Sequence, residues 1–93
     1  MRDRRFEPRH TANDPVEVSW PGGTGSGILR DYSRSGARIE MEHPVKVGTE
    51  AHIKVRGLEL AGQIRSCVRT QTAAHLLGIE FDPEFQGKIR RNS

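Results

Sequence analysis

Glycine and proline recur along almost the whole chain, and this feature constrains the fold more than any other. The 93 residues include ten glycines and five prolines, which leave no uninterrupted stretch of ordinary helix length until the end of the sequence. Between these breaks, apolar residues alternate with polar ones over short runs, which is the period of a strand with one buried face. The pattern predicts an all-β fold built from short strands.

The alternating runs predict six strands, at residues 16–20, 28–30, 37–41, 51–55, 58–68 and 75–81. The glycine-rich stretch at 21–27 is expected to form a flexible turn between the first two strands. In the fifth strand, the even-numbered residues from Leu58 to Val68 are expected to face the core, and Cys67 is expected to face outward. Gly62, inside this run, is expected to mark a bulge or a bend.

Six short strands in so small a chain favour a closed or nearly closed antiparallel barrel, because closure removes the edges that a small open sheet must protect. A two-sheet sandwich is the alternative. After the last strand, Asp82 and Pro83 suit the N-cap and the first residue of a short C-terminal helix. We therefore expect one domain with a flexible, arginine-rich segment at 1–15, the barrel at 16–81, and the short helix and tail at 82–93.

Composition excludes several classes of function. Cys67 is the only cysteine, so no internal disulfide can form, and the four histidines lack the close spacing of a metal site. No apolar run reaches the length of a membrane span and no signal peptide is visible, so we expect a cytoplasmic protein without membrane insertion. No nucleophile lies in a recognisable elbow and no carboxylates have a catalytic spacing, so an enzyme is not expected.

The first candidate binding motif is a group of arginines near the N-terminus. Arg4 directly precedes Arg5, and three residues separate Arg5 from Arg9. A guanidinium group can bind phosphate oxygens through two parallel hydrogen bonds, contact O6 and N7 of guanine, and stack on a base. A solvated basic tail is the alternative interpretation.

The second candidate motif lies between the second and third expected strands, at residues 31–36. Asp31 can accept hydrogen bonds from the N1–H and N2–H₂ groups of a guanine, an edge that adenine does not present. Ser33 can donate to a phosphate, and Gly36 permits a positive φ or a close backbone approach. An ordinary turn is the alternative, because Asp, Ser and Gly are common in turns for local reasons.

Together, the two motifs resemble those of the PilZ domain family, R-x-x-x-R followed, after a strand and a turn, by [D/N]-x-S-x-x-G. Arg5 and Arg9 match the first motif, and Asp31, Ser33 and Gly36 match the second. The stretch LGIEF at residues 77–81 is similar to the last strand of that family. The resemblance covers essentially the whole chain.

The resemblance implies a bacterial receptor for cyclic di-GMP that performs no chemistry on its ligand and needs no other cofactor. Arg5 and Arg9 would contact phosphate and the Hoogsteen edge of guanine as the N-terminal segment folds over the ligand. Asp31 would take the Watson–Crick edge of guanine, and Ser33 with Gly36 would line the barrel surface.

Other residues extend this expected site. An arginine at the position of Arg4 is associated in this family with two mutually intercalated ligand molecules, so the resemblance implies two per protomer. Arg65 and Arg69 are expected on the outer face of the fifth strand, where Arg69 could stack on a base or contact a phosphate. His75 could also approach the ligand. A solvated barrel exterior is the alternative for these strand residues.

Two other classes of function stay open. A small barrel that binds single-stranded DNA or RNA has a similar size, but the five aromatic residues offer few stacking platforms near the basic segment. A PilZ-type protein-interaction module without a ligand is the second class, although such modules typically lack one of the two motifs. We expect a monomer with no DNA or RNA partner, which transmits its signal to an unidentified protein partner.

Overall fold

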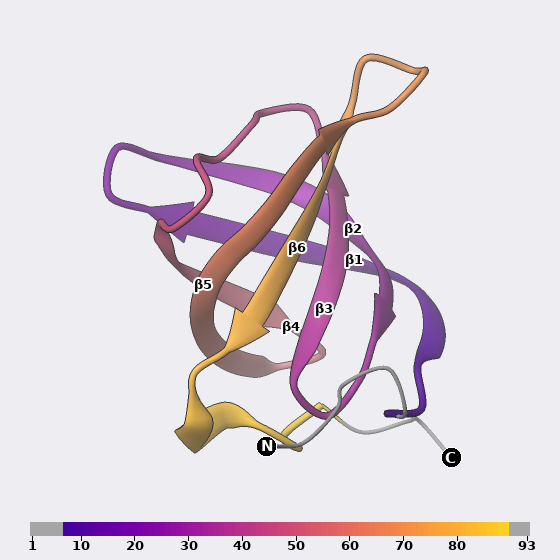
Figure 1. The fold of residues 1–93 in the computed structure, drawn as a ribbon, viewed down its shortest axis with the longest axis vertical. Helices are drawn as coiled ribbons and strands as arrows, with labels where there is room; N and C mark the ends of the chain where they lie inside the picture. Colours follow the sequence, from indigo (N-terminus) through magenta and orange to yellow (C-terminus); the bar gives the residue numbers. More distant parts are fainter. Residues whose placement is uncertain (1–6, 90–93) are drawn as a thin grey trace.

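The structure is a closed barrel of six antiparallel strands (Figure 1). It is a computed structural model, and it describes residues 7–89. The strands are β1 (His10–Trp20), β2 (Gly23–Tyr32), β3 (Gly36–Met41), β4 (Glu50–Val55), β5 (Leu58–Arg69) and β6 (His75–Phe81). They follow the order β1-β2-β3-β6-β5-β4 around the barrel, and β4 pairs with β1 to close it. The predicted all-β, six-stranded antiparallel barrel is confirmed.

Alternating side chains fill the interior of the barrel. In β1, Val16 and Val18 are buried while Glu17 between them is exposed, and the other strands follow the same rule over most of their length. The largest fully buried side chains belong to Val18, Leu29, Ile39, Ile53, Ile64, Leu77 and Phe81. Every strand contributes at least one of them, so burial of apolar surface from all sides stabilises the closed form.

β2 begins earlier than expected. The turn after β1 consists of residues 21–22, and the following residues already pair with β1. A Cβ at Gly23 would lie 2.9 Å from Cζ2 of Trp20, and a Cβ at Gly25 would lie 2.5 Å from Cε of Met41. The expected long flexible turn is therefore wrong, because these glycines lie in the strand where large side chains occupy the space beside them.

β1 also begins earlier than expected, at His10 rather than at Val16. His10 and Thr11 pair with the last residues of β2, and a register shift follows before Asp14. The expected start of the barrel after residue 15 therefore falls inside β1. The apolar pattern does not reveal this pairing, because residues 10–15 contain little alternation of apolar side chains.

β5 carries a register shift that exchanges its two faces near the C-terminal end. The pairing with β6 shifts between Ile64 and Ser66 rather than at Gly62. Beyond this bulge Cys67 packs against the core, while Val68 is 59% exposed. The expected outward position of Cys67 and inward position of Val68 are wrong, because one extra residue in a strand moves the following side chains to the opposite face.

The expected C-terminal helix is only a 3₁₀ turn, η2 (Pro83–Phe85). Pro83 begins it as predicted, but the side chain of Asp82 makes no capping hydrogen bond and interacts with Glu50 instead. The turn ends at Gln86, whose backbone is already extended with a ψ of 136°, and Gly87 follows with a positive φ of 77°. Within residues 7–89, no helix is long and apolar enough to cross a membrane.

Gly62 permits a close approach between β5 and β6. A Cβ at Gly62 would lie 2.1 Å from the carbonyl oxygen of Glu80, which is a main-chain atom. Since a strand backbone cannot yield as a side chain does, Gly62→Ala is expected to lower the free energy of unfolding by about 3 kcal/mol. In the matched variant Gly25→Ala, the Cβ meets the flexible end of Met41, so the expected loss is below about 1 kcal/mol. Urea denaturation measures both losses, and equal values would contradict this account of Gly62.

The carboxylate of Glu50 is disfavoured by its surroundings. Hydrogen bonding with Asp82, burial, and the negative charge of Asp82 raise the pKa of Glu50 above its ordinary value. A carboxyl group with a raised pKa in the folded state weakens folding at neutral pH; this penalty is relieved as the pH falls through the raised pKa, and it is absent below the ordinary pKa of 4.5. Glu50→Gln is therefore expected to raise the Tm by a few degrees at neutral pH.

The gain in Tm should fade as the solution is made acidic, because Glu50 then becomes protonated in the folded and unfolded states alike. Thermal unfolding followed by circular dichroism at neutral and acidic pH measures both values. A gain of the same size at both pH values would rule out ionisation of Glu50 as the cause.

Candidate functional site

The loop between β2 and β3 holds the second motif, and the barrel fixes its conformation. The N–H of Ser33 donates to the carbonyl oxygen of Gly36 at 2.8 Å, which closes a tight turn. The carbonyl oxygen of Ser35 accepts a hydrogen bond of 2.8 Å from the N–H of Phe81 at the end of β6. Both serines are buried. The motif is therefore a rigid part of the barrel rather than an exposed flexible turn.

Gly36 lies where β3 approaches β6 closely. A Cβ at this position would lie 2.4 Å from the carbonyl oxygen of Ile79. The sequence left two roles open for this glycine, and its φ is not positive. A close backbone approach is the role that the structure supports.

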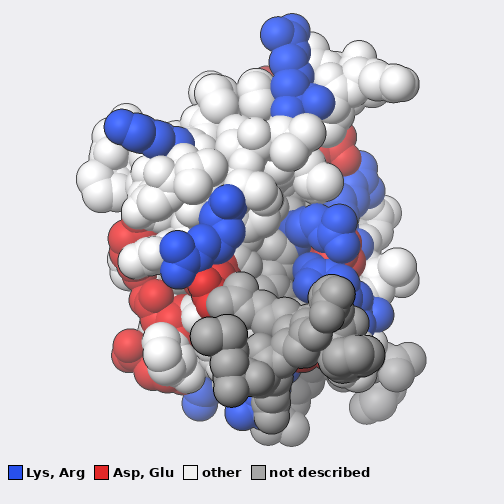
Figure 2. Space-filling view, in the orientation of Figure 1, with Lys and Arg blue, Asp and Glu red and all other residues white. Residues whose placement is uncertain are grey.

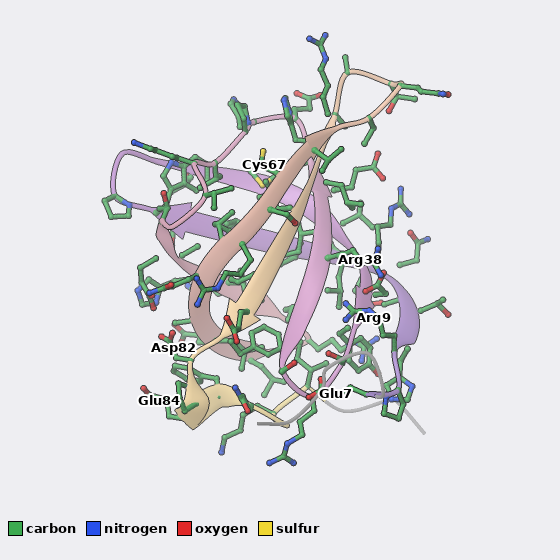
Figure 3. All side chains as sticks on the ribbon, viewed as in Figure 1. Glu7, Arg9, Arg38, Cys67, Asp82 and Glu84 are labelled. Atoms are coloured by element: carbon green, nitrogen blue, oxygen red, sulfur yellow. The ribbon has the colours of Figure 1, made fainter. Side chains whose placement is uncertain are left out.

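Asp31 brings the two motifs together. Nε of Arg9 donates to Oδ1 of Asp31 at 2.9 Å, and a second nitrogen of the same side chain lies 2.5 Å from that oxygen. Arg38 of β3 approaches from another side, with its Nε 3.1 Å from Oδ2. The third nitrogen of Arg9 lies 3.5 Å from the hydroxyl oxygen of Ser33. Asp31 thus pairs with two guanidinium groups that come from distant parts of the chain, and Figure 3 shows both arginines on one side of the barrel.

Glu7 ties the chain before β1 to the same loop. The hydroxyl group of Ser35 donates to Oε1 of Glu7 at 2.7 Å. Glu7 occupies one of the unspecified positions of the first motif, and Arg38 lies outside both motifs. A signal existed for Arg38, because it follows the motif glycine by two residues and therefore shares its strand face, but none existed for Glu7. Arg4 and Arg5, which the sequence places in the site, lie outside the described residues.

A depression of about 300 Å³ lies beside these residues, on the outer face of β3, β6 and β5. Its lining consists of Arg9, Ser35, Gly36, Ala37, Arg38, Arg65, Ser66, Gly78, Ile79 and Glu80. In the sheet, Gly78 pairs with Arg38 on one side and with Ser66 on the other. Because Gly78 has no side chain, the hydroxyl group of Ser66 can lie over it; a Cβ at Gly78 would stand 2.4 Å from that oxygen.

Only Arg65 of the two arginines expected on the outer face of β5 lines the depression. Its Nε donates to Oε1 of Glu80, another lining residue, at 2.7 Å. Arg69 pairs with His75 near the far end of β5, and neither residue lines the depression. Nδ1 of His75 lies 3.0 Å from the carbonyl oxygen of Glu42. The structure therefore places Arg38 and Arg65 at the candidate site, and places Arg69 and His75 away from it.

The ion pairs of the site lie near the surface. The side chains of Arg9, Arg38 and Arg65 are 39%, 48% and 57% exposed. Lys and Arg side chains gather on the side of the barrel where Figure 3 labels Arg9 and Arg38 (Figure 2, right). Exposed ion pairs contribute only about 0–1 kcal/mol each to the free energy of unfolding. These guanidinium groups can therefore exchange one partner for another at little cost in free energy. Among residues 7–89, no group of three or more His, Cys, Asp or Glu side chains could hold a metal ion.

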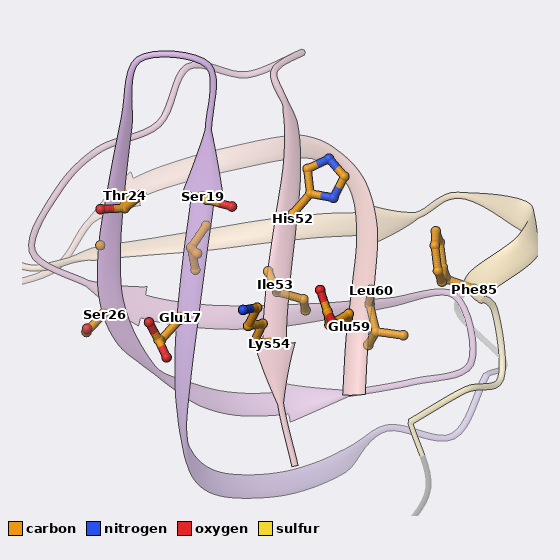
Figure 4. Close-up of a pocket in the computed structure, with 12 residues that line it drawn as sticks. Glu17, Ser19, Thr24, Ser26, His52, Ile53, Lys54, Glu59, Leu60 and Phe85 are labelled. Atoms are coloured by element: carbon orange, nitrogen blue, oxygen red, sulfur yellow. The ribbon is translucent and has the colours of Figure 1, made fainter. Parts of the chain in front are cut away.

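A larger pocket of about 820 Å³ lies elsewhere on the barrel (Figure 4). Polar side chains of β1, β2 and β4 border it, including Glu17, Thr24, His52 and Lys54. Glu17 and Lys54 are cross-strand neighbours of opposite charge, and no residue of the two motifs lines the pocket. The smaller depression is therefore the better candidate, because Arg9, Ser35 and Gly36 line it. Asp31 and Ser33 do not line it, but both contact Arg9.

The sequence matches the family model described as the PilZ domain over residues 3–91. This chain belongs to the PilZ domain family. PilZ domains are binding modules rather than enzymes. No curated protein matches the chain. The family that the two motifs predicted is thus confirmed.

Two solved PilZ domains are similar to this one in structure. The PilZ domain of YcgR from Escherichia coli, solved with c-di-GMP, matches with a TM-score of 0.70 and 16% sequence identity, over 92% of this chain and 82% of that chain. The PilZ domain of CeSA from a cellulose-synthesizing bacterium matches with a TM-score of 0.58 and 27% identity, over 85% of this chain and 86% of that chain. At 16% identity, the likeness to YcgR concerns the fold.

The charges of the site are expected to contribute little to the folding of this PilZ domain. Asp31→Asn removes the negative charge that pairs with Arg9 and Arg38, but both arginine side chains are exposed. The free energy of unfolding should therefore change by less than about 1 kcal/mol. Urea denaturation followed by the fluorescence of Trp20 measures the change. A loss above about 2 kcal/mol would show that the fold itself requires Asp31.

Proposed function

We propose that this PilZ domain is a receptor for cyclic di-GMP and binds it at the depression beside Asp31. One observation carries the proposal: Asp31 of the second motif pairs with Arg9 of the first, and Arg38 lies against the same carboxylate. A carboxylate and several guanidinium groups on one surface complement the donors of guanine and the oxygens of phosphate. The similar PilZ domain of YcgR, which was solved with c-di-GMP, supports the choice of ligand.

Both kinds of chemical group in the ligand find partners here. Asp31 accepts hydrogen bonds from N1–H and N2–H₂ of a guanine, which selects guanine over adenine. Arg9 and Arg38 donate to phosphate oxygens or to O6 and N7 of a guanine. Gly36 lines the depression, and Ser33 adjoins it through its contact with Arg9. Gly78 has no side chain, and the small side chain of Ser66 lies over it, which lets the ligand approach the sheet closely.

Binding proceeds through an exchange of partners at Asp31. In the ligand-free protein this carboxylate already accepts hydrogen bonds from Arg9 and Arg38. The guanine donors replace the guanidinium groups at the carboxylate, and the released guanidinium groups turn to the phosphates. Every charged group therefore has a partner before and after binding, which avoids the cost of an unpaired charge.

The N-terminal arginines extend the proposed site. Glu7 is hydrogen-bonded to Ser35 beside the depression, and Arg5 precedes Glu7 by two residues. We propose that Arg5 contacts phosphate and the Hoogsteen edge as its segment folds over the ligand, and that Arg4 supports a second, intercalated ligand molecule. Charge-assisted hydrogen bonds to the ligand offset the entropy lost on ordering. The bound form, which catalyses no reaction, then signals to a protein partner.

Isothermal titration calorimetry with cyclic di-GMP tests the proposed function. Arg9→Ala and Asp31→Ala are each expected to weaken binding by at least about 30-fold, because each removes a charged partner of the ligand. Arg69→Ala is the matched control, since it removes an exposed arginine outside the depression and should leave the affinity unchanged. The ligand-free variants are expected to keep a Tm within a few degrees of the parent.

Several results would count against the proposal. A parent protein that does not bind cyclic di-GMP would overturn it, and equal affinity for cyclic di-AMP would contradict the role of Asp31. Tight, salt-sensitive binding of a short single-stranded RNA would favour a nucleic-acid-binding barrel instead. A stoichiometry near two that falls to one in Arg4→Ala would support the role of Arg4, and a parent stoichiometry of one would contradict it.

A further inference from the structure

Arg56 occupies a position that its own turn does not explain. It forms the two-residue turn between β4 and β5 together with Gly57, and both residues have positive φ, 54° and 75°. Such hairpin turns favour Asn, Asp or Gly at the first position, because a longer side chain makes the left-handed conformation unfavourable. An arginine therefore has a local cost here, and its contacts elsewhere must offset that cost.

The side chain of Arg56 reaches across the barrel end to β1 and β2. Its guanidinium group forms an ion pair with Asp14 and lies 5.0 Å from the ring centroid of Tyr32. One of its nitrogens also lies 3.4 Å from the hydroxyl oxygen of Tyr32. The side chains of Arg56 and Asp14 are only 17% and 26% exposed, and the hydrogen bond between them lowers the pKa of Asp14. This is a partly buried ion pair, in which the geometry is held more firmly than at the surface.

The same cluster includes a residue at the start of β1. The rings of His10 and Tyr32 lie 5.2 Å apart with an interplanar angle of 44°, and the two residues pair in the sheet. His10 directly follows Arg9, and Tyr32 directly follows Asp31. Successive side chains of a strand point to opposite faces, so the ring pair lies behind the ion pair of the candidate site.

The register between β1 and β2 is irregular in this region. The pairing shifts between Thr11 and Asp14, so two residues of β1 lie outside the regular ladder. A bulge weakens the local hold of one strand on the next. Arg56 connects the two strands at this bulge, because it forms an ion pair with Asp14 of β1 and contacts Tyr32 of β2.

We propose that Arg56 is a positioning residue for the candidate site: across the end of the barrel it holds the start of β1 against the end of β2, and thereby sets the geometry between Arg9 and Asp31. The expected effect of Arg56 on the affinity for cyclic di-GMP rests on the proposed function. Its expected effect on the contact between Arg9 and Asp31 does not. Arg56 does not line the depression. Its loss would act by letting Arg9 and Asp31 drift apart before the ligand arrives.

Arg56→Asn tests this inference, because asparagine suits the positive φ and preserves the turn while removing the clamp. Nitrogen-15 NMR of the Nε–H group of Arg9 in the ligand-free protein reports on its hydrogen bond to Asp31. In Arg56→Asn we expect this signal to move toward its position in Asp31→Asn and its exchange with water to quicken several-fold. Arg56→Lys, which keeps the charge but loses the planar group, should give an intermediate result.

Ile53→Val is the control for general loosening, since it lowers stability from a buried position in the neighbouring strand. The proposal is overturned if the Arg9 signal is unchanged in Arg56→Asn, or if it changes equally in Ile53→Val at a matched loss of Tm. Should Arg56→Asn fail to fold, the comparison between Arg56→Lys and Ile53→Val decides in the same way.

Affinity for cyclic di-GMP gives a second measurement. Arg56→Asn is expected to weaken binding about tenfold in the parent and hardly at all in an Arg9→Ala background, because the clamp acts through Arg9. Independent, additive losses in the double variant would contradict the positioning role. If the parent protein does not bind the ligand, the proposed function fails, and the NMR measurement still decides the role of Arg56.

Discussion

The close approach of β3 and β5 to β6 is the constraint on which the barrel and its site both depend. Gly36 and Gly62 face main-chain oxygens of consecutive residues in β6, at positions where a Cβ would overlap them. Glycine at both positions lets two neighbouring strands close tightly around β6. Gly78, within β6 itself, leaves room on the outer face for the side chain of Ser66. Gly36, which permits this closure, therefore also lines the depression together with Gly78.

The start of β1 and the end of β2 pair with each other, and the two faces of this paired region carry different kinds of interaction. Outside, exposed guanidinium groups pair with Asp31 and can change partners at little cost. Inside, the ring of Tyr32 is buried and contacts His10 and Arg56. A rigid interior behind an adaptable surface suits ligand recognition, because the direction of each side chain is fixed while its hydrogen-bond partners are not.

The sequence predicted the parts of the molecule that depend on local pattern. Alternation located the apolar strands and hence the barrel, but it missed the start of β1, where residues 10–15 are held by main-chain pairing and by the ion pair of Asp14. The motifs predicted that Arg9 and Asp31 contact one ligand, and the structure brings the two side chains within hydrogen-bond distance. Arg65 could not be preferred to Arg69, because Arg65 lies within the irregularity between Ile64 and Ser66, which no sequence pattern reveals.

The exposure of the arginines at Asp31 has a consequence for ionic strength. Dissolved ions screen an exposed ion pair and also screen the contact between an arginine and a phosphate. If a ligand replaces one such pair by another, both sides of the exchange weaken together as salt is added. In a domain whose arginines are already paired before binding, the fraction with bound ligand therefore changes less with salt concentration. In a domain whose arginines are unpaired before binding, it changes more.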